Sequence, residues 1–331
     1  MGILRRKGRN GGADAESTHD LYYASDVHGS DVCWRKFLGA GRHYGVPTLI
    51  MGGDLTGKVI VPVERRSDGS HVATFLGEER SASSADELDR LTAAIRYNGM
   101  YPWVTTPEEI ARMREDDAAR SELFDRLIVE GLREWIALGD ERAEAYGLDV
   151  FVMPGNDDPW ACDDVLEAAK RVHSTADRTV RVGEHEMISC AYANPTPWNS
   201  PRELDEGALY DRINRLASQL ERPETAIFNL HVPPYDSGLD TAREIDENLK
   251  IVLRNSQPNE IPVGSTAVRE LIEEYQPMLS LHGHIHESKG EARIGRTLAL
   301  NSGSEYASGR IHGVTVSLAG DRVRSHQFTI G

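Results

Sequence analysis

The segment Met278-Leu279-Ser280-Leu281-His282-Gly283-His284-Ile285-His286 does most to predict the fold of this chain. Its apolar start is typical of a buried strand, and Gly283 marks a turn directly after that strand. His284 and His286 stand two residues apart on this turn. Imidazoles are common ligands of borderline divalent metals. The segment therefore predicts a strand that ends in a metal-binding turn.

Four more polar blocks have the same position relative to a strand-like stretch. Each follows a short apolar run that is typical of a strand. Together with the double-histidine turn, they predict one site assembled from five loops. The four blocks are Asp26-Val27-His28 after Leu21–Ser25, Gly52-Gly53-Asp54 after Thr48–Met51, Gly155-Asn156-Asp157-Asp158 after Val150–Met153, and His231-Val232-Pro233-Pro234 after Ala226–Leu230.

The order of the elements predicts a layered α/β domain. A strand at Leu21–Ser25, a helix at Asp31–Tyr44 and a strand at Thr48–Met51 form a β-α-β start. The same strand-and-loop rhythm returns in the second half of the chain. We expect one such domain over residues 18–331, interrupted by an insertion at about 58–146.

The insertion has a pattern of its own. The runs Val59–Val63 and His71–Phe75 flank an Asp68-Gly69 turn, which is the sequence signature of a hairpin. From about Ala85 to Tyr146 the sequence is charged and helical in character, and two prolines break it into pieces. We therefore expect a hairpin and several helices. Their aromatic residues either pack a small core, which is favoured, or form a substrate cap or a surface for oligomerisation.

The composition limits the classes of function. Asp and Glu outnumber Lys and Arg 53 to 37 among the 331 residues, for a formal net charge of −16. This balance disfavours nucleic acid as a partner, because non-specific binding of phosphates needs clustered cations. It leaves a phosphate substrate open, since bound metals reverse the local charge.

The ends and the cysteines of the chain carry expectations about its environment. Residues 1–17 are basic and lack an apolar segment, so we expect a disordered tail rather than a signal peptide. No apolar run is long enough to span a bilayer, so no membrane partner is expected. Three scattered cysteines favour a cytoplasmic protein with reduced thiols.

The ordered set Asp-x-His, Gly-Asp, Gly-Asn-x-Asp, a lone His and Gly-His-x-His resembles the calcineurin-like metallophosphoesterase superfamily. Each block alone is a weak signal, whereas the whole set in this order, each member after a strand, is a strong one. The stretches His231–Asp240, His282–Glu287 and Asn301–Tyr306 are similar in detail to the Icc-related predicted phosphoesterases of bacteria and archaea. This closer resemblance does not extend to the insertion.

The resemblance implies a four-layer αββα sandwich of the metallophosphoesterase type, with two divalent metal ions at the strand ends. Mn, Fe, Zn and Ni suit a mixture of carboxylate and imidazole ligands, and Mn is favoured. Two ions about 3.5–4 Å apart activate a bridging water for in-line attack on a phosphoester, so no covalent intermediate is expected. The implied ligands are Asp26, His28 and His286 for one ion, Asn156, His231 and His284 for the other, and Asp54 as a bridge between them.

Asp157 is the position at which the chain departs from the family pattern. Many members have a histidine after the Gly-Asn pair, which is thought to protonate the leaving oxygen. A carboxyl group with an ordinary pKa near ~3.9 is a poor acid at neutral pH. Asp157 can serve as the acid only where burial or neighbouring carboxylates raise its pKa. We therefore expect diesters and aryl phosphates, which have good leaving groups, to be better substrates than alkyl monoesters.

These observations predict a metal-dependent phosphoric ester hydrolase that acts on a small-molecule phosphoester. A phosphodiesterase is favoured over a phosphomonoesterase or a nuclease, and a non-catalytic metal-binding scaffold of the same fold is the alternative from another class. Two supporting residues are left open. Asp158 either caps the helix after it, which is favoured, or orients a ligand. His282 either supports the site or fills space.

Overall fold

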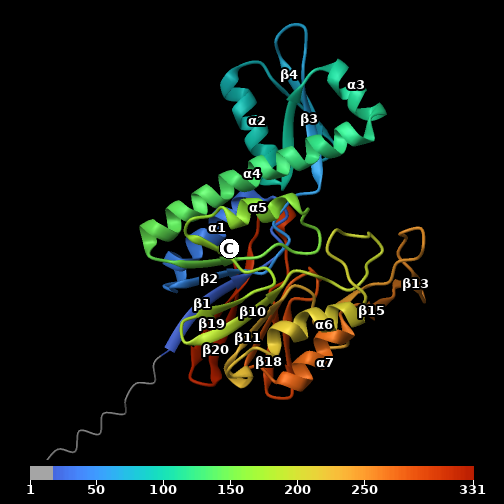
Figure 1. The fold of residues 1–331 in the computed structure, drawn as a ribbon. Helices are drawn as coiled ribbons and strands as arrows, with labels where there is room; N and C mark the ends of the chain where they lie inside the picture. Colours follow the sequence, from blue (N-terminus) through green and yellow to red (C-terminus); the bar gives the residue numbers. More distant parts are fainter. Residues whose placement is uncertain (1–17) are drawn as a thin grey trace, which may run out of the picture.

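Two six-stranded sheets form the centre of the computed structural model, which describes residues 18–331 (Figure 1). The tail expected at residues 1–17 lies outside the described residues. The first sheet has the order β20 (Arg322–Ile330), β19 (His312–Ala319), β1 (Thr18–Ala24), β2 (Thr48–Met51), β7 (Asp149–Val152), β8 (Val172–Ser174). The second has the order β17 (Gly290–Ile294), β18 (Thr297–Asn301), β16 (Leu279–His282), β11 (Ile227–Leu230), β10 (His185–Cys190), β9 (Thr179–Val182).

Helices cover the outer face of each sheet (Figure 1). The helices α1 (Asp31–Tyr44), α4 (Asp117–Tyr146) and α5 (Ala161–Glu167) pack on the first sheet, and α6 (Glu206–Ala217) and α7 (Thr266–Tyr275) pack on the second. Two short 3-10 helices lie at Pro223–Thr225 and Tyr306–Ser308. The layers follow one another in the order α, β, β, α, which confirms the four-layer sandwich.

The alternation of side chains along β1 explains the layering. Tyr22 belongs to the cluster that the first sheet forms with α1, where it packs near Phe37. Leu21 and Tyr23 point the other way, into the cluster between the two sheets, which Leu279 of the second sheet shares. Because successive side chains of a strand face opposite sides, a strand covered on both faces must be apolar throughout. This explains why the strands are continuous apolar runs in the sequence.

The parallel strands bring the five polar blocks to one region. β1, β2 and β7 run parallel in the first sheet, and β10, β11, β16 and β18 run parallel in the second. In parallel strands the carboxyl ends lie at the same edge of a sheet, where open α/β sheets bind ligands. The loops that follow β1, β2, β7, β11 and β16 carry the five blocks.

The insertion contains a separate four-stranded sheet with the order β5 (Glu78–Ala82), β4 (His71–Phe75), β3 (Val59–Arg65), β6 (Met100–Thr105). The helix α2 (Ala85–Tyr97) packs on this sheet and α3 (Pro107–Glu115) precedes α4. The helical interpretation was wrong for Met100–Thr105, which pairs parallel to β3. As an edge strand, β6 tolerates Pro102, because only one of its sides forms a hydrogen-bond ladder.

Two short antiparallel pairs form in the stretch between residues 241 and 262. They are β12 (Thr241–Arg243) with β15 (Glu260–Pro262), and β13 (Leu253–Arg254) with β14 (Gln257–Pro258). Within residues 18–331, none of the helices combines the length and the apolar character that crossing a membrane requires.

Two aromatic residues of the insertion, Trp135 and Tyr101, pack against the buried cluster that the first sheet forms with α1. Trp135 of α4 stacks on Trp34 of α1, with ring centroids 5.2 Å apart and ring planes 4° from parallel. Its indole nitrogen donates a hydrogen bond to Asp31. Tyr101 packs edge-on against Phe124, with centroids 6.0 Å apart. The long helix α4, which runs from the insertion across α1 in Figure 1, therefore joins the insertion to the sandwich.

We expect Trp135→Ala to lower the free energy of unfolding by about 3 kcal/mol or more, because it leaves a cavity against Trp34. Trp135 is 7% exposed, whereas Trp198 is 66% exposed and serves as the matched control. Urea unfolding followed by circular dichroism measures both variants. An equal loss of stability in Trp198→Ala and Trp135→Ala would contradict this account of α4.

Candidate metal centre

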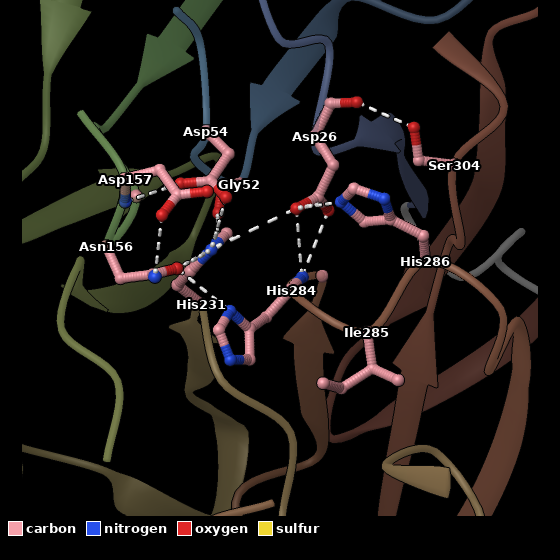
Figure 2. A network of polar contacts seen from close by, with 12 residues as sticks. Asp26, Gly52, Asp54, Asn156, Asp157, His231, His284, Ile285, His286 and Ser304 are labelled. Carbon is pink, nitrogen blue, oxygen red and sulfur yellow. Dashed lines mark hydrogen bonds and ion pairs between the residues drawn. The ribbon is translucent and has the colours of Figure 1, made fainter. Parts of the chain in front are cut away.

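The five loops meet in one place, and the side chains predicted as metal ligands point toward one another there (Figure 2). Backbone hydrogen bonds continue beyond the strands and hold neighbouring loops together. The N–H of Asp26 donates to the carbonyl of Gly53 over 3.0 Å, and the N–H of Gly283 donates to the carbonyl of His231 over 3.0 Å. The loops of each sheet are therefore in fixed register at the site.

The predicted ligands form two adjacent groups. Within each group the ligand atoms lie within 4.8 Å of one another: Asp26, His28 and His286 in the first, and Asp54, His231 and His284 in the second. The amide oxygen Oδ1 of Asn156 belongs to the second group, since it lies 3.0 Å from Nε2 of His231 and 2.8 Å from Nδ1 of His284. The structure thus brings all seven residues together.

Asp54 lies between the two groups. Its Oδ2 atom is 3.6 Å from Nε2 of His28 in the first group and 3.4 Å from Nε2 of His231 in the second. Its Oδ1 atom accepts a hydrogen bond of 3.1 Å from the backbone N–H of Asp157. One oxygen is therefore held by the backbone while the other faces both groups. This is the arrangement that a bridging carboxylate needs.

A backbone contact orients the imidazole of His231. Its Nδ1 atom lies 2.8 Å from the carbonyl oxygen of Gly52, and the side chain is fully buried. Because a carbonyl can only accept, Nδ1 carries a proton, which leaves Nε2 as the ring nitrogen that would bind a metal. Hydrogen bonding of the second ring nitrogen is the usual way in which proteins fix a metal-binding histidine.

The chemistry of these side chains fits divalent cations. The Nε2 atoms of His28 and His286 face each other at 3.1 Å, and Nδ1 of His28 is a buried nitrogen with no hydrogen-bond partner. Asp26 and Asp54 are only 1% and 2% exposed. Two buried carboxylates surrounded by converging imidazoles offer oxygen and nitrogen ligands alone, which suits borderline metals. The side chain of His286 is 33% exposed, so the site opens beside the double-histidine turn.

The electrostatics of the metal-free protein show how much negative charge the site concentrates. Burial lowers the pKa of His28 to about 3 and that of His284 to about 4, so both rings are neutral and able to bind a metal. Burial acts in the same direction on His231, but the charges of Asp54 and Asp26 outweigh it and raise the pKa of His231 to about 10. Without a metal, a proton on His231 compensates the carboxylates.

Four of the predicted ligands have left-handed backbone conformations. The φ angles are 58° at Asp26, 39° at His28, 51° at Asp54 and 65° at His284. This region costs an L-residue with a Cβ roughly 1–2 kcal/mol. Such strain persists only where the surroundings impose it, and it gathers at functional sites. The loops are therefore held in a conformation that places side chains rather than one that minimises backbone energy.

Asp158 supports the site, and the helix-capping interpretation was wrong. Its buried carboxylate accepts hydrogen bonds from the backbone N–H groups of Leu55 at 3.0 Å, Thr56 at 2.8 Å and Gly155 at 2.8 Å. The N-cap of α5 is instead Trp160, which forms no side-chain cap. Asp158 thus fastens the loop of Asp54 to the loop of Asn156, a link between positions about a hundred residues apart that no local pattern indicates.

Two further residues support the second sheet's loops. His282 contacts the carbonyl oxygens of Leu230 at 2.8 Å and Val232 at 3.0 Å, one on each side of His231. The side-chain nitrogen of Asn301 donates to the carbonyl of Ile285 at 3.0 Å, between the two histidines of the turn. Of the two interpretations of His282, support for the site is the one that these contacts favour.

The surroundings of Asp157 do not favour its role as an acid. Its carboxylate forms an ion pair with Lys58, accepts a hydrogen bond of 2.6 Å from the Ser200 hydroxyl and another of 3.2 Å from the Asn156 amide. Burial alone would raise the pKa of Asp157, but these contacts outweigh burial and lower it. The condition set for the acid role, a raised pKa, is therefore not met. No motif in the sequence singled out Lys58.

Sequence comparison identifies a relative that matches part of the chain. No family model matches the chain. It is 29% identical over 158 residues to the uncharacterized protein MJ1162 of Methanocaldococcus jannaschii, a match that covers 46% of this chain and 63% of that protein. The match therefore spans less than two thirds of the relative's length.

Solved structures share the architecture at low sequence identity. Two crystal structures match 95% of this chain and 99% of their own, with TM-scores of 0.53 and 0.51 at 14% and 12% identity; the second is TT1561 of Thermus thermophilus. A structure described as a novel archaeal phosphodiesterase matches 94% of this chain and 99% of its own, with a TM-score of 0.37 at 10% identity. The first two likenesses establish a common fold.

We expect Gly283→Ala to weaken metal binding by at least about tenfold, as changes to residues that orient metal ligands do. A Cβ on Gly283 would lie 2.2 Å from the Ser25 hydroxyl and 2.3 Å from Oδ2 of Asp26. Gly290→Ala is the matched control, because its Cβ would meet only Leu239, at 3.5 Å. Titration with Mn²⁺ by isothermal calorimetry measures both variants. Wild-type affinity in Gly283→Ala would show that Asp26 binds no ion.

Proposed function

We propose that this chain is a dinuclear metal-dependent phosphoric ester hydrolase, most suited to phosphodiesters. The observation that carries the proposal is the position of Asp54, whose single oxygen Oδ2 faces the imidazoles of both ligand groups. A lone structural metal needs one closed set of ligands. Two adjacent sets that share a carboxylate and open to solvent are instead the ligand arrangement of a hydrolytic two-metal centre.

The proposed ligand assignment follows the two groups. When bound, such a pair of ions lowers the pKa of a water molecule, polarises a phosphoryl oxygen and neutralises developing charge. The residues that would hold the ions are Asp26, His28 and His286 on one side, Asn156, His231 and His284 on the other, and Asp54 on both. Mn²⁺ remains the ion we favour.

The protein's own contribution is to hold these ligands in place and to keep its cysteine thiols unreactive. The Asp157 backbone N–H fixes one oxygen of Asp54, and the Gly52 carbonyl fixes the ring of His231. All three cysteines are free and buried, and burial raises the pKa of each thiol. A protonated, buried thiol is a poor nucleophile. These features support direct hydrolysis over a cysteine-linked intermediate.

We expect Asp54→Asn to slow hydrolysis of bis-p-nitrophenyl phosphate by at least about a hundredfold. The loss of a residue that only supports a metal ligand costs about 10–100-fold, and the loss of a bridging ligand should cost more. The protein is loaded in turn with Mn, Fe, Ni and Zn, and bound metal is counted by mass spectrometry. Asp164→Asn, an exposed carboxylate of α5, is the matched control and should be fully active.

The scaffold alternative has a distinct outcome in the same experiment. A wild-type protein that binds two ions per chain, yet hydrolyses no activated ester above the Asp54→Asn background, would be a metal-binding scaffold. A wild-type protein that binds no divalent metal would contradict both interpretations.

We also expect a preference for good leaving groups. With Asp157 ionised by its contacts to Lys58 and Ser200, it is a poor proton donor for a departing alkoxide. Turnover of bis-p-nitrophenyl phosphate should therefore exceed that of glycerol phosphate by roughly a hundredfold or more, since general acid catalysis contributes about 10²–10⁴. Faster turnover of glycerol phosphate would mean that another group protonates the leaving oxygen.

A further inference from the structure

Lys58 lies where the chain leaves the metal-site loop and enters the insertion. It follows Gly57 and directly precedes β3. Its ammonium forms an ion pair with the carboxylate of Asp157. The side chain of Lys58 is 54% exposed, whereas that of Asp157 is 18% exposed. A cation is therefore held from the protein side by a carboxylate while more than half of its side chain faces solvent.

The carboxylate that holds Lys58 is itself close to both ligand groups. An oxygen of Asp157 lies within 4.8 Å of ligand atoms of His28 and Asp54. Hydrogen bonds from the Ser200 hydroxyl, at 2.6 Å, and the Asn156 amide, at 3.2 Å, fix this carboxylate in place. The ammonium that contacts Asp157 is thus placed at the edge of the candidate metal centre.

The backbone before Lys58 is equally well fixed. The N–H of Gly57 donates to the hydroxyl of Tyr101 over 3.0 Å. A Cβ on Gly57 would lie 2.1 Å from the carbonyl oxygen of Gly99, and one on Gly99 would lie 2.3 Å from the carbonyl oxygen of His28. Only glycines allow the insertion and the His28 loop to approach so closely. The insertion therefore determines where Lys58 stands relative to the centre.

The chemistry of this position suits an anionic oxygen. An ammonium has three N–H donors in a tetrahedral arrangement, and Asp157 engages it from one side only. A phosphoryl group in the candidate centre carries several non-bridging oxygens. Two metal ions need not bind all of them, so one can still accept a hydrogen bond. A lysine acts on such oxygens as a point charge and hydrogen-bond donor.

We propose that Lys58 is a substrate-binding residue whose ammonium, held in place by Asp157, donates to a non-bridging oxygen of the bound phosphoryl group. In this arrangement Asp157 is a positioning residue, and the insertion contributes directly to substrate recognition. The inference rests on the proposed function, because the metal centre is what brings the phosphoryl group to this place.

Titration of inorganic phosphate into the Mn²⁺-loaded protein by isothermal calorimetry tests this proposal without requiring turnover. We expect Lys58→Met to raise the Kd for phosphate roughly tenfold, the effect of one charge-assisted hydrogen bond that is partly exposed to water. Lys58→Arg should raise it less, and Lys170→Met, an exposed lysine just after α5, should leave it unchanged. Metal content and circular dichroism show that each variant is loaded and folded.

A double variant separates substrate binding from a purely structural ion pair. If Lys58 donates to phosphate directly, K58M/D157N should bind phosphate more weakly than D157N alone, because the ammonium still contributes when its carboxylate partner is gone. If Lys58 acts only by tying two loops together through Asp157, the two variants bind phosphate equally, and that result overturns the proposal.

The failure of this inference is distinguishable from that of the proposed function. Equal Kd values for phosphate, and equal KM and kcat for bis-p-nitrophenyl phosphate, in wild type and Lys58→Met overturn the role of Lys58 and leave the hydrolase standing. A wild-type protein that binds two ions but neither phosphate nor ester overturns both.

Discussion

Two buried carboxylates, Asp26 and Asp54, impose the constraint on which the rest of this structure depends. A carboxylate withdrawn from water is costly unless opposite charge and hydrogen bonds replace its hydration. The partners of these two come from loops of both sheets, including the N–H of His284, which contacts both oxygens of Asp26 at 3.1 Å. The carboxylates are satisfied only when the two sheets face each other in this register. The negative charges of these two carboxylates raise the pKa of His231 to about 10. Two divalent cations would balance the same charge more fully.

The layered architecture supplies the rigidity that such a site requires. Each sheet is covered on both faces, so the strands beneath the loops lie in closely packed surroundings. That support lets Asp26, His28, Asp54 and His284 keep strained left-handed conformations at the strand ends. Supporting groups such as Asp158 then join loops to one another. The packing of the layers therefore fixes the positions of the ligands. The backbone preferences of the ligand residues alone would favour other conformations.

The insertion takes part in this arrangement through its points of attachment. Stacking of Trp135 on Trp34 fixes α4 on the sandwich, and the contact of Gly99 with the His28 loop fixes β6 beside the site. Lys58, at the start of the insertion, forms the ion pair with Asp157. The proposed contact between Lys58 and a phosphoryl group would couple substrate preference to the insertion. The same ion pair accounts for the loss of acid character at Asp157, so one contact bears on both binding and leaving-group choice.

The amino-acid sequence by itself determined the buried strands, the helix at Asp31–Tyr44, and the residue types that gather at the strand ends. These follow from periodicity and ligand chemistry, which are local properties of the chain. Only the tertiary structure decided the strand at Met100–Thr105, the role of Asp158 and the pairing of Lys58 with Asp157. An edge strand is defined by its neighbour, and a buried carboxylate by donors about a hundred residues away. Such partners are chosen by the packing of distant loops, which leaves no trace in neighbouring residues.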